Sequence, residues 1–164
     1  MNSSSGTTSG GGRANKTGNS LEQFVEHKLK EHGYTEFWDH KRQVFANRTT
    51  IGGKQYGKQI YCGKSIYETD RKCDFLVLNQ EKWPDGLIIE CKWQQSSGSV
   101  DEKYPFAFFN ICKIGVPTVV LLDGNGYKPA AMRWLKEQAH PQRALIAVYN
   151  MVEFQTAVNN GFLG

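Results

Sequence analysis

The sequence predicts an α/β domain in which helices cover a central sheet. Helical and strand patterns alternate through the second half of the chain, which is typical of such layered domains. Residues 117–122 are almost wholly apolar, as expected for a central strand that is covered on both faces. The chain has 164 residues, of which 39% are hydrophobic, and this suits one domain that folds without disulfide or metal cross-links.

Composition narrows the class of protein. Charged residues make up 22% and aromatic residues 12%, which excludes a wholly disordered chain. No apolar run approaches the roughly 18 residues of a membrane span, and we expect a cytoplasmic protein without membrane contact. The net charge of +4 permits nucleic-acid binding but does not identify it. The cysteines lack zinc-site spacing and are expected to be buried free thiols: Cys62, Cys73, Cys91 and Cys112.

The first part of the chain divides into a tail and a helix. Residues 1–18 are rich in serine and glycine and are expected to form a flexible tail ahead of a single domain at residues 19–164. A helix is predicted to begin at Ser20, which forms a capping box with Gln23, and to end near Gly33. Its apolar stripe consists of Leu21, Phe24, Val25 and Leu29.

Strands and helices then follow in order. Residues 34–58 hold aromatic residues and glycines that indicate strand edges and turns without fixing their bounds. A second capping box, Ser99 with Glu102, starts a helix that runs to about Ile114 and buries Phe108, Ile111 and Cys112. The other predicted elements are strands at residues 59–67, 72–79, 87–93, 117–122 and 144–149, turns at 83–86 and 123–126, and helices at 129–139 and 151–159.

Charged residues interrupt two of the apolar strands. The strand period of two puts Glu90 and Lys92 on one face and Cys91 on the other. Asp74 interrupts the preceding strand in the same way. Burying such charges is costly unless they are paired or bind a ligand. Two neighbouring carboxylates repel each other, so a divalent cation or a shared proton is expected between them.

This combination suits phosphate chemistry. Two carboxylates that hold Mg²⁺ leave open positions for substrate oxygens, and the ion polarises a phosphoryl group and lowers the pKa of bound water. Lys92 can orient that water or stabilise charge on the phosphate. Asp74, Glu90 and Lys92 therefore predict a site for phosphodiester hydrolysis. The alternative is a structural Asp–Lys or Glu–Lys ion pair.

The same residues carry a family resemblance. Asp74, followed after a hairpin-length gap by Ile-Ile-Glu-Cys-Lys-Trp-Gln, resembles the PD-(D/E)XK nuclease superfamily, with its restriction-endonuclease-like fold. The order of elements also resembles that family's αβββαβ core, a central mixed sheet flanked by helices. The resemblance covers about residues 19–123. It departs at Cys73, which stands where the family has a proline.

The resemblance implies roles for the residues that match. Asp74 and Glu90 would bind Mg²⁺, for which Mn²⁺ would substitute, and Lys92 would assist the attacking water. The backbone carbonyl of Cys91 would be a further metal ligand. Glu22 on the first helix resembles a glutamate that completes the metal site in many relatives; the alternative is a helix-start carboxylate favoured by the macrodipole.

Gln94 lies two residues after Lys92 and resembles the glutamine of the Glu-x-Lys-x-Gln pattern in some branches of the family. That role would place the Gln94 side chain at the scissile phosphate or at a metal-bound water. An ordinary hydrogen bond at the strand end is an equally weighted alternative.

A basic stretch supports a polyanionic partner. Residues 41–72 contain eight Lys or Arg against two acidic residues, and Tyr56, Tyr61 and Tyr67 are interleaved with them. The alternative is a solvated hairpin face. Lys103 opens a helix, where backbone N–H groups are free to meet a phosphate. The expected DNA contacts are Arg71, Lys72, Lys103 and Lys64.

Three functions fit these residues. The first is a Mg²⁺-dependent DNA endonuclease, restriction-endonuclease-like, that cuts both strands as a homodimer matching the two-fold symmetry of the duplex. The second is a structure-specific repair or recombination nuclease, similar to a junction resolvase. The third is a non-catalytic DNA-binding module on the same fold, which would bind DNA without needing Mg²⁺.

Overall fold

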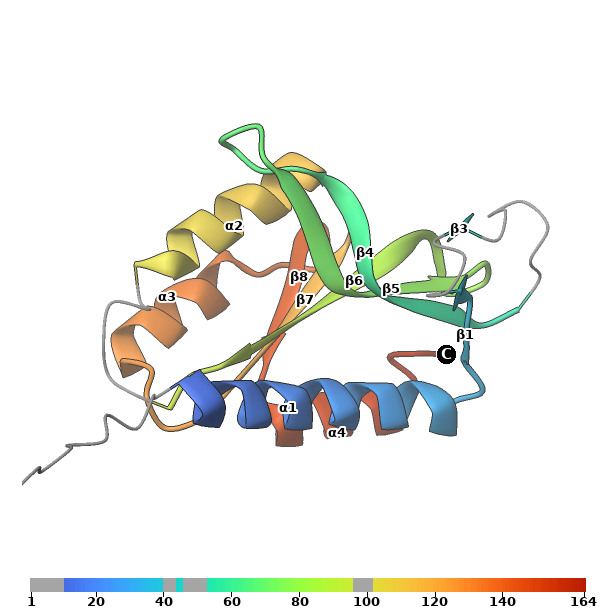
Figure 1. The fold of residues 1–164 in the computed structure, drawn as a ribbon, viewed down its shortest axis with the longest axis horizontal. Helices are drawn as coiled ribbons and strands as arrows, with labels where there is room; N and C mark the ends of the chain where they lie inside the picture. The colour runs from blue at the N-terminus through green and yellow to red at the C-terminus, as the bar shows by residue number, and fades with distance from the viewer. Residues whose placement is uncertain (1–10, 40–43, 46–52, 96–101) are drawn as a thin grey trace, which may run out of the picture.

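Six strands form one mixed sheet at the centre of the computed structural model, which describes residues 11–39, 44–45, 53–95 and 102–164 (Figure 1). Across the sheet the order is β1-β4-β5-β6-β7-β8. β4, β5 and β6 are antiparallel neighbours, whereas β7 and β8 run parallel to β6, and β1 runs parallel to β4. The strands are β1 (Thr35–Glu36), β4 (Gln55–Lys64), β5 (Asp70–Asn79), β6 (Trp83–Trp93), β7 (Thr118–Asp123) and β8 (Leu145–Tyr149). A separate short pair consists of β2 (Trp38–Asp39) and β3 (Val44–Phe45).

Helices cover both faces of this sheet, which confirms the predicted α/β class. α1 (Gly11–Glu31) and α4 (Met151–Asn159) lie on one face, and α2 (Lys103–Ile114) and α3 (Pro129–Gln138) lie on the other (Figure 1). Along the chain, α1, β4 to β6, α2 and β7 give the expected αβββαβ order. None of the helices within the described ranges is long and apolar enough to cross a membrane.

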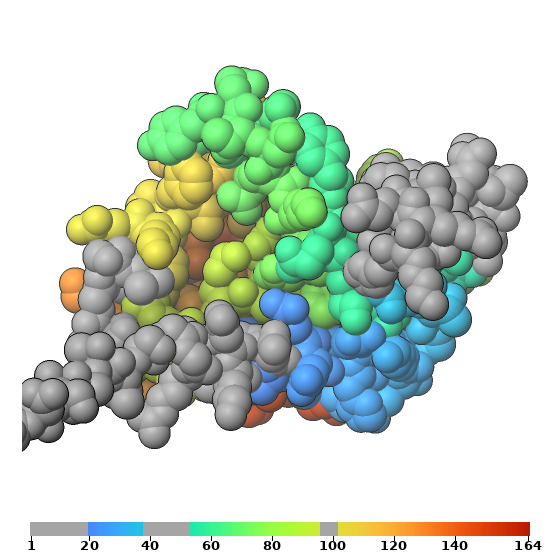
Figure 2. Space-filling view, viewed as in Figure 1, coloured from blue at the N-terminus to red at the C-terminus, as the bar shows by residue number. Residues whose placement is uncertain are grey.

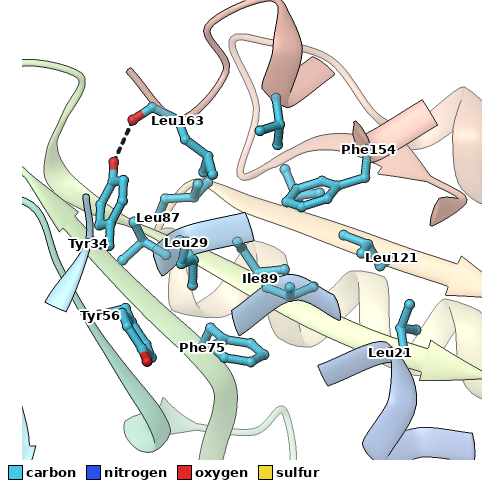
Figure 3. Packing of buried hydrophobic residues seen from close by; sticks show 14 residues of the cluster. Leu21, Leu29, Tyr34, Tyr56, Phe75, Leu87, Ile89, Leu121, Phe154 and Leu163 are labelled. Carbon is cyan, nitrogen blue, oxygen red and sulfur yellow. Dashed lines mark hydrogen bonds between the residues drawn. The ribbon is translucent and has the colours of Figure 1, made fainter. Parts of the chain in front are cut away.

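The face under α1 and α4 holds the larger group of buried residues (Figure 3). Leu21, Val25 and Leu29 are fully buried, so the predicted stripe of α1 is confirmed. The Tyr34 hydroxyl, just after α1, donates a hydrogen bond to the Leu163 carbonyl and ties the end of the chain to this face. The opposite face packs α2 and α3 against β7 and β8 through Tyr104, Ile111, Val120, Leu122, Met132, Leu135, Leu145 and Val148.

The start of α1 differs from the expectation. The helix begins at Gly11, not at Ser20, so part of the expected flexible tail at residues 1–18 is helical. Residues 1–10 lie outside the described part of the chain. Extending a helix whose packed turns have already formed avoids the cost of nucleation, which offsets in part the low helix propensity of Gly11, Gly12 and Gly18.

Two local predictions near β6 and α2 are wrong. Residues 83–86 belong to β6 rather than to a turn, because Asn79 Oδ1 accepts the backbone N–H groups of Glu81 and Lys82 and closes the turn earlier. Glu102 is the N-cap of α2 and makes no side-chain cap, while Ser99 lies outside the described residues.

The buried face of α2 also differs from the expected one. Ile111 is buried as expected, but Phe108 is only partly buried and Cys112 is exposed. Asn110 is buried instead, because its side chain accepts the Ile66 N–H and donates to the backbone of its own helix. Of the four free thiols, Cys73 alone is fully buried.

Candidate active site

The sheet forks on one side of its central strand β6. The last residues that pair between β5 and β6 are Phe75 and Ile89, beyond which the two strands separate. Asp74 and Glu90 are therefore the first residues past the fork. β6 stays paired to β7 as far as its own end, so it presents a fixed row of side chains beside the opening.

The side chains of β6 alternate as predicted. Ile89 and Cys91 pack with the apolar residues under α1 and α4. Glu90 and Lys92 lie on the other face, where Lys92 lines a cavity together with Val120 of β7. The expectation that Glu90 and Lys92 share one face is confirmed.

Asp74 is held by one hydrogen bond from each neighbouring strand, β6 across the fork and β4 on the other side. The Cys91 N–H donates to Asp74 Oδ2 at 2.7 Å, and Gln59 Nε2 donates to Asp74 Oδ1 at 3.0 Å. Asp74 is partly exposed, so the expectation of a fully buried carboxylate is wrong for this residue. Gln59 has a φ of 51°, in the left-handed region that few non-glycine residues adopt. No motif marked Gln59 in the sequence, and only its backbone conformation draws attention to it.

Glu90 lies between two cations. Its side chain is 6% exposed, and its Oε2 accepts a hydrogen bond from Lys92 Nζ at 2.7 Å. Its Oε1 lies 3.5 Å from Arg71 Nη2 on β5. Burial alone would lower the pKa of Lys92, but the charges of Glu90 and Asp74 and the hydrogen bond to Glu90 outweigh it and raise that pKa. Lys92 is therefore a stable ammonium group beside the fork.

Glu22 faces the same opening from α1. Burial and the nearby charge of Asp74 raise the pKa of Glu22, against the opposing charges of Lys58 and Lys92. The electrostatic coupling between Glu22 and Asp74 favours the interpretation that Glu22 belongs to the site rather than only to the helix start. A cation bound between two carboxylates that repel each other lowers the free energy of the folded protein.

Glu26, one turn further along α1, binds β4. Because Glu26 lies further round the helix from the apolar stripe than Glu22, the sequence predicts a solvated side chain here, and this prediction is wrong. Tyr56 Oη donates to Glu26 Oε1 at 2.8 Å, Lys58 Nζ lies 3.1 Å from Oε2, and Lys30 Nζ lies 2.9 Å from Oε1. Burial acts to raise the pKa of Glu26, but the hydrogen bonds from Lys30, Tyr56 and Lys58 outweigh it and lower the pKa to about 2. This network fixes α1, and with it Glu22, against the sheet.

The Glu26 network gives a testable pH dependence of stability. The unfolded carboxyl ionises near pH 4.5, so ionised Glu26 stabilises the fold above that pH and the contribution is lost as the pH falls towards about 2. We expect Glu26→Gln to lower the free energy of unfolding by about 2 kcal/mol at pH 7, measured by urea denaturation. The difference from wild type should shrink at pH 3. Glu31→Gln, which removes an exposed ion pair on the same helix, is the control and should leave the free energy of unfolding close to that of wild type. Equal stability of Glu26→Gln and wild type at pH 7 would contradict the network's role.

Gln94 is engaged at both ends of its amide. Tyr104 Oη donates to Gln94 Oε1, and Gln94 Nε2 donates to the Gly126 carbonyl at 3.0 Å. The backbone of Gln94 also packs closely against the turn after β7, because a Cβ at Gly124 would lie 2.1 Å from the Gln94 carbonyl oxygen. With 3% of its surface exposed, Gln94 fits the strand-end hydrogen bond better than a phosphate contact. It fixes the end of β6 against the turn that follows β7.

The expected DNA contacts are placed unevenly. Arg71 and Lys103 line the same cavity as Lys92, so these two flank the site. Lys72 is exposed on β5, and Lys64 is paired with Asp70 at the far end of the β4–β5 hairpin.

Of the interleaved tyrosines, Tyr61 and Tyr67 are 50% and 72% exposed, whereas Tyr56 is fully buried and cannot contact DNA. Residues 41, 42 and 48 of the basic stretch lie outside the described residues.

A cavity of about 530 Å³ opens beside Lys92, between α2 and the sheet. Figure 2 shows the corresponding hollow between helix α2, in yellow, and the green β4–β5 hairpin. A larger cavity of about 680 Å³ lies at the opposite end of β6, around Trp83 and Val116, and none of the candidate site residues lines it. We therefore associate the smaller cavity with the site.

The oxygen ligands at the fork suit a hard divalent cation. Asp74, Glu90 and Glu22 offer carboxylates, and the backbone of Cys91 on β6 lies within hydrogen-bond distance of Asp74. Within the ranges that the structure describes, no three His, Cys, Asp or Glu side chains are gathered closely enough to form a metal cluster. The chemistry of these donors and the repulsion between Glu22 and Asp74 fit Mg²⁺ or Mn²⁺.

Comparison with known proteins agrees with the geometry. No curated protein and no solved structure matches the chain. The family model of the PD-(D/E)XK nuclease superfamily domain matches residues 13–162, which includes α1, the fork and the C-terminal helices. The match begins within α1, ahead of the domain start expected at residue 19. The chain belongs to the PD-(D/E)XK nuclease superfamily.

Proposed function

We propose that the protein is a Mg²⁺-dependent deoxyribonuclease that hydrolyses phosphodiester bonds at the fork between β5 and β6. The observation that carries this proposal is the placement of Asp74 and Glu90 as the first residues past the fork, with Lys92 Nζ 2.7 Å from Glu90. The family supports a nuclease in general. The oxygen ligands support Mg²⁺, and Arg71 and Lys103 beside Lys92 support a polyanionic substrate.

Each residue at the fork has a role in this proposal. Asp74, Glu90 and the Cys91 carbonyl would hold the ion, and Glu22 would add a further carboxylate. Bound Mg²⁺ would supply the positive charge that polarises a phosphoryl oxygen and lowers the pKa of a water molecule. The Cys91 N–H and Gln59 fix Asp74 in advance, so that carboxylate needs little reorganisation when substrate binds.

Lys92 acts on the phosphate in this proposal. Its ammonium group uses one N–H on Glu90 and has two more donors, and its side chain is 41% exposed. A charged donor at this position can orient the attacking water and stabilise the negative charge that develops on the phosphate oxygens. The charges of Glu90 and Asp74 raise the pKa of Lys92 and so favour the charged form that donates hydrogen bonds.

Metal removal tests the proposal. We expect supercoiled plasmid to be cut by the purified protein with Mg²⁺ or Mn²⁺, and not after EDTA treatment, with cutting restored by added Mg²⁺. Agarose gels of the plasmid forms give the readout. Cutting that persists in EDTA would rule out the metal dependence. Absence of cutting on plasmid, branched and single-stranded DNA, together with metal-independent DNA binding in a calorimetric titration, would favour the non-catalytic binding module.

Substrate choice separates the two nuclease alternatives. A restriction-endonuclease-like enzyme that cuts both strands is expected to act as a homodimer, because one site cuts one strand and the duplex is two-fold symmetric. Discrete linear fragments and a dimer mass by light scattering would support it. A monomer that prefers branched or partly unpaired DNA would support the structure-specific nuclease. The cavity beside Lys92 favours the structure-specific nuclease.

A further inference from the structure

The cavity between α2 and the sheet has a lining that the proposed hydrolysis does not need. Its charged side chains are Arg71, Lys92 and Lys103, and no acidic side chain of residues 53–95 or 102–164 lines it. The Arg71 Nε is buried and has no hydrogen-bond partner in the described part of the chain. An anionic group with acceptor oxygens is the ligand that these cations would bind best.

Apart from Gln94, whose amide is bonded to Tyr104 and Gly126, the rest of the lining is mostly aromatic and apolar. Phe106 of α2 lines the cavity and also stacks on Tyr67 of the β4–β5 hairpin, with ring centroids 5.3 Å apart and planes 24° apart. Val120, Leu122 and Leu135 line the cavity from β7 and α3. This surface cannot satisfy the polar backbone of DNA, but it suits the flat face of a nucleobase.

Resting on the proposed function, we propose that this cavity holds one unpaired nucleotide of the substrate next to the scissile phosphate. The base lies against Phe106 and the apolar floor, and its phosphate lies towards Arg71, Lys92 and Lys103. A volume of about 530 Å³ lies within the range of small-molecule sites. A base inside a duplex is stacked and paired and cannot enter without flipping out, so the cavity favours single strands, flaps and mismatches over intact duplex.

The inference is tested by binding measurements without metal, so that no cutting occurs. Fluorescence anisotropy in EDTA compares a labelled 15-nucleotide oligo-dT with a hairpin of the same charge whose stem is fully paired and whose loop is a glycol linker without bases. We expect the single strand to bind roughly tenfold more tightly. Phe106→Leu, which keeps apolar volume but removes the ring, should lower the affinity for the single strand roughly tenfold and leave the affinity for the hairpin unchanged.

Two controls keep the test decisive. Phe109→Leu removes an aromatic ring that is 53% exposed on the same helix and does not line the cavity, so its affinity should match wild type. With the wild-type protein, a dT pentamer should displace the label at a roughly tenfold lower concentration than a pentamer of the same sugars and phosphates without bases. This second comparison does not depend on the folding of any variant.

The possible outcomes separate the two proposals. Equal binding of single strand and hairpin, or equal competition by the two pentamers, would overturn the nucleotide site even if the plasmid is cut with Mg²⁺. Equal losses in Phe106→Leu and Phe109→Leu would overturn it too, because the effect would then belong to α2 in general. A protein that prefers the base-containing pentamer but cuts no DNA with any metal would keep the nucleotide site and contradict the proposed hydrolysis.

Discussion

Glu90→Gln is expected to lower the rate of DNA cleavage by at least about 1000-fold. The substitution keeps the shape of the side chain and removes the charge that would hold the ion, and the loss of several kcal/mol of charge stabilisation corresponds to this factor. The measurement is single-turnover cleavage of a labelled oligonucleotide with Mg²⁺, compared with wild type at the same protein concentration.

The structure also defines the control for this variant. Glu90 neutralises Arg71 and Lys92, so its removal leaves two neighbouring cations without their shared partner and lowers the free energy of unfolding. Thermal unfolding must therefore confirm that Glu90→Gln is folded at the assay temperature. Asp70→Asn removes an exposed carboxylate from the same β5 that carries Asp74, where it pairs with Lys64, and should cleave at the wild-type rate. Cleavage by folded Glu90→Gln within tenfold of wild type would contradict a metal site at the fork.

The elements that local sequence patterns determine were predictable. The stripe of Leu21, Val25 and Leu29, the almost wholly apolar β7 and the Glu90–Lys92 alternation depend on patterns within one element, and the structure has all of them. The helix α4 has the predicted bounds, and a capping box between Asn150 and Glu153 starts it. Periodicity says which face of an element is buried, and this was enough to place the chemistry on one sheet face.

What the sequence did not show depends on contacts between distant elements. Glu26 lies on α1, and the groups from β4 that bind it, Tyr56 and Lys58, are about 30 residues away along the chain. Gln94 is satisfied by Tyr104 from α2. Gln59 reaches Asp74 only because its backbone adopts a positive φ inside a strand. No local pattern encodes these three arrangements, since each needs the sheet and helices to be in place first.

Lys92→Met is expected to lower the cleavage rate by about 100- to 1000-fold with little loss of stability. Methionine keeps the unbranched stem and removes the only donor that the motif directs at the substrate, which is the usual loss when one charged hydrogen-bond donor is removed from a transition state. The fold should tolerate it, because Glu90 keeps Arg71 as a partner and the side chain that is changed is partly exposed. Single-turnover cleavage, together with urea denaturation, measures both quantities.

The contrast between the two motif variants distinguishes catalysis from structure. If Glu90 and Lys92 formed only a structural ion pair, DNA cleavage, if present, would persist in both Lys92→Met and Glu90→Gln. In the proposed site the two variants both lose cleavage, but only Glu90→Gln leaves like charges facing each other and loses stability. Lys92→Arg is a further test, because the longer guanidinium group keeps the positive charge but not its position. A cleavage rate above about a tenth of the wild-type rate would show that the charge alone suffices. We expect recovery below that level, because Lys92 Nζ lies 2.7 Å from Glu90 at the edge of the cavity, where a displaced donor no longer meets the same phosphate oxygen.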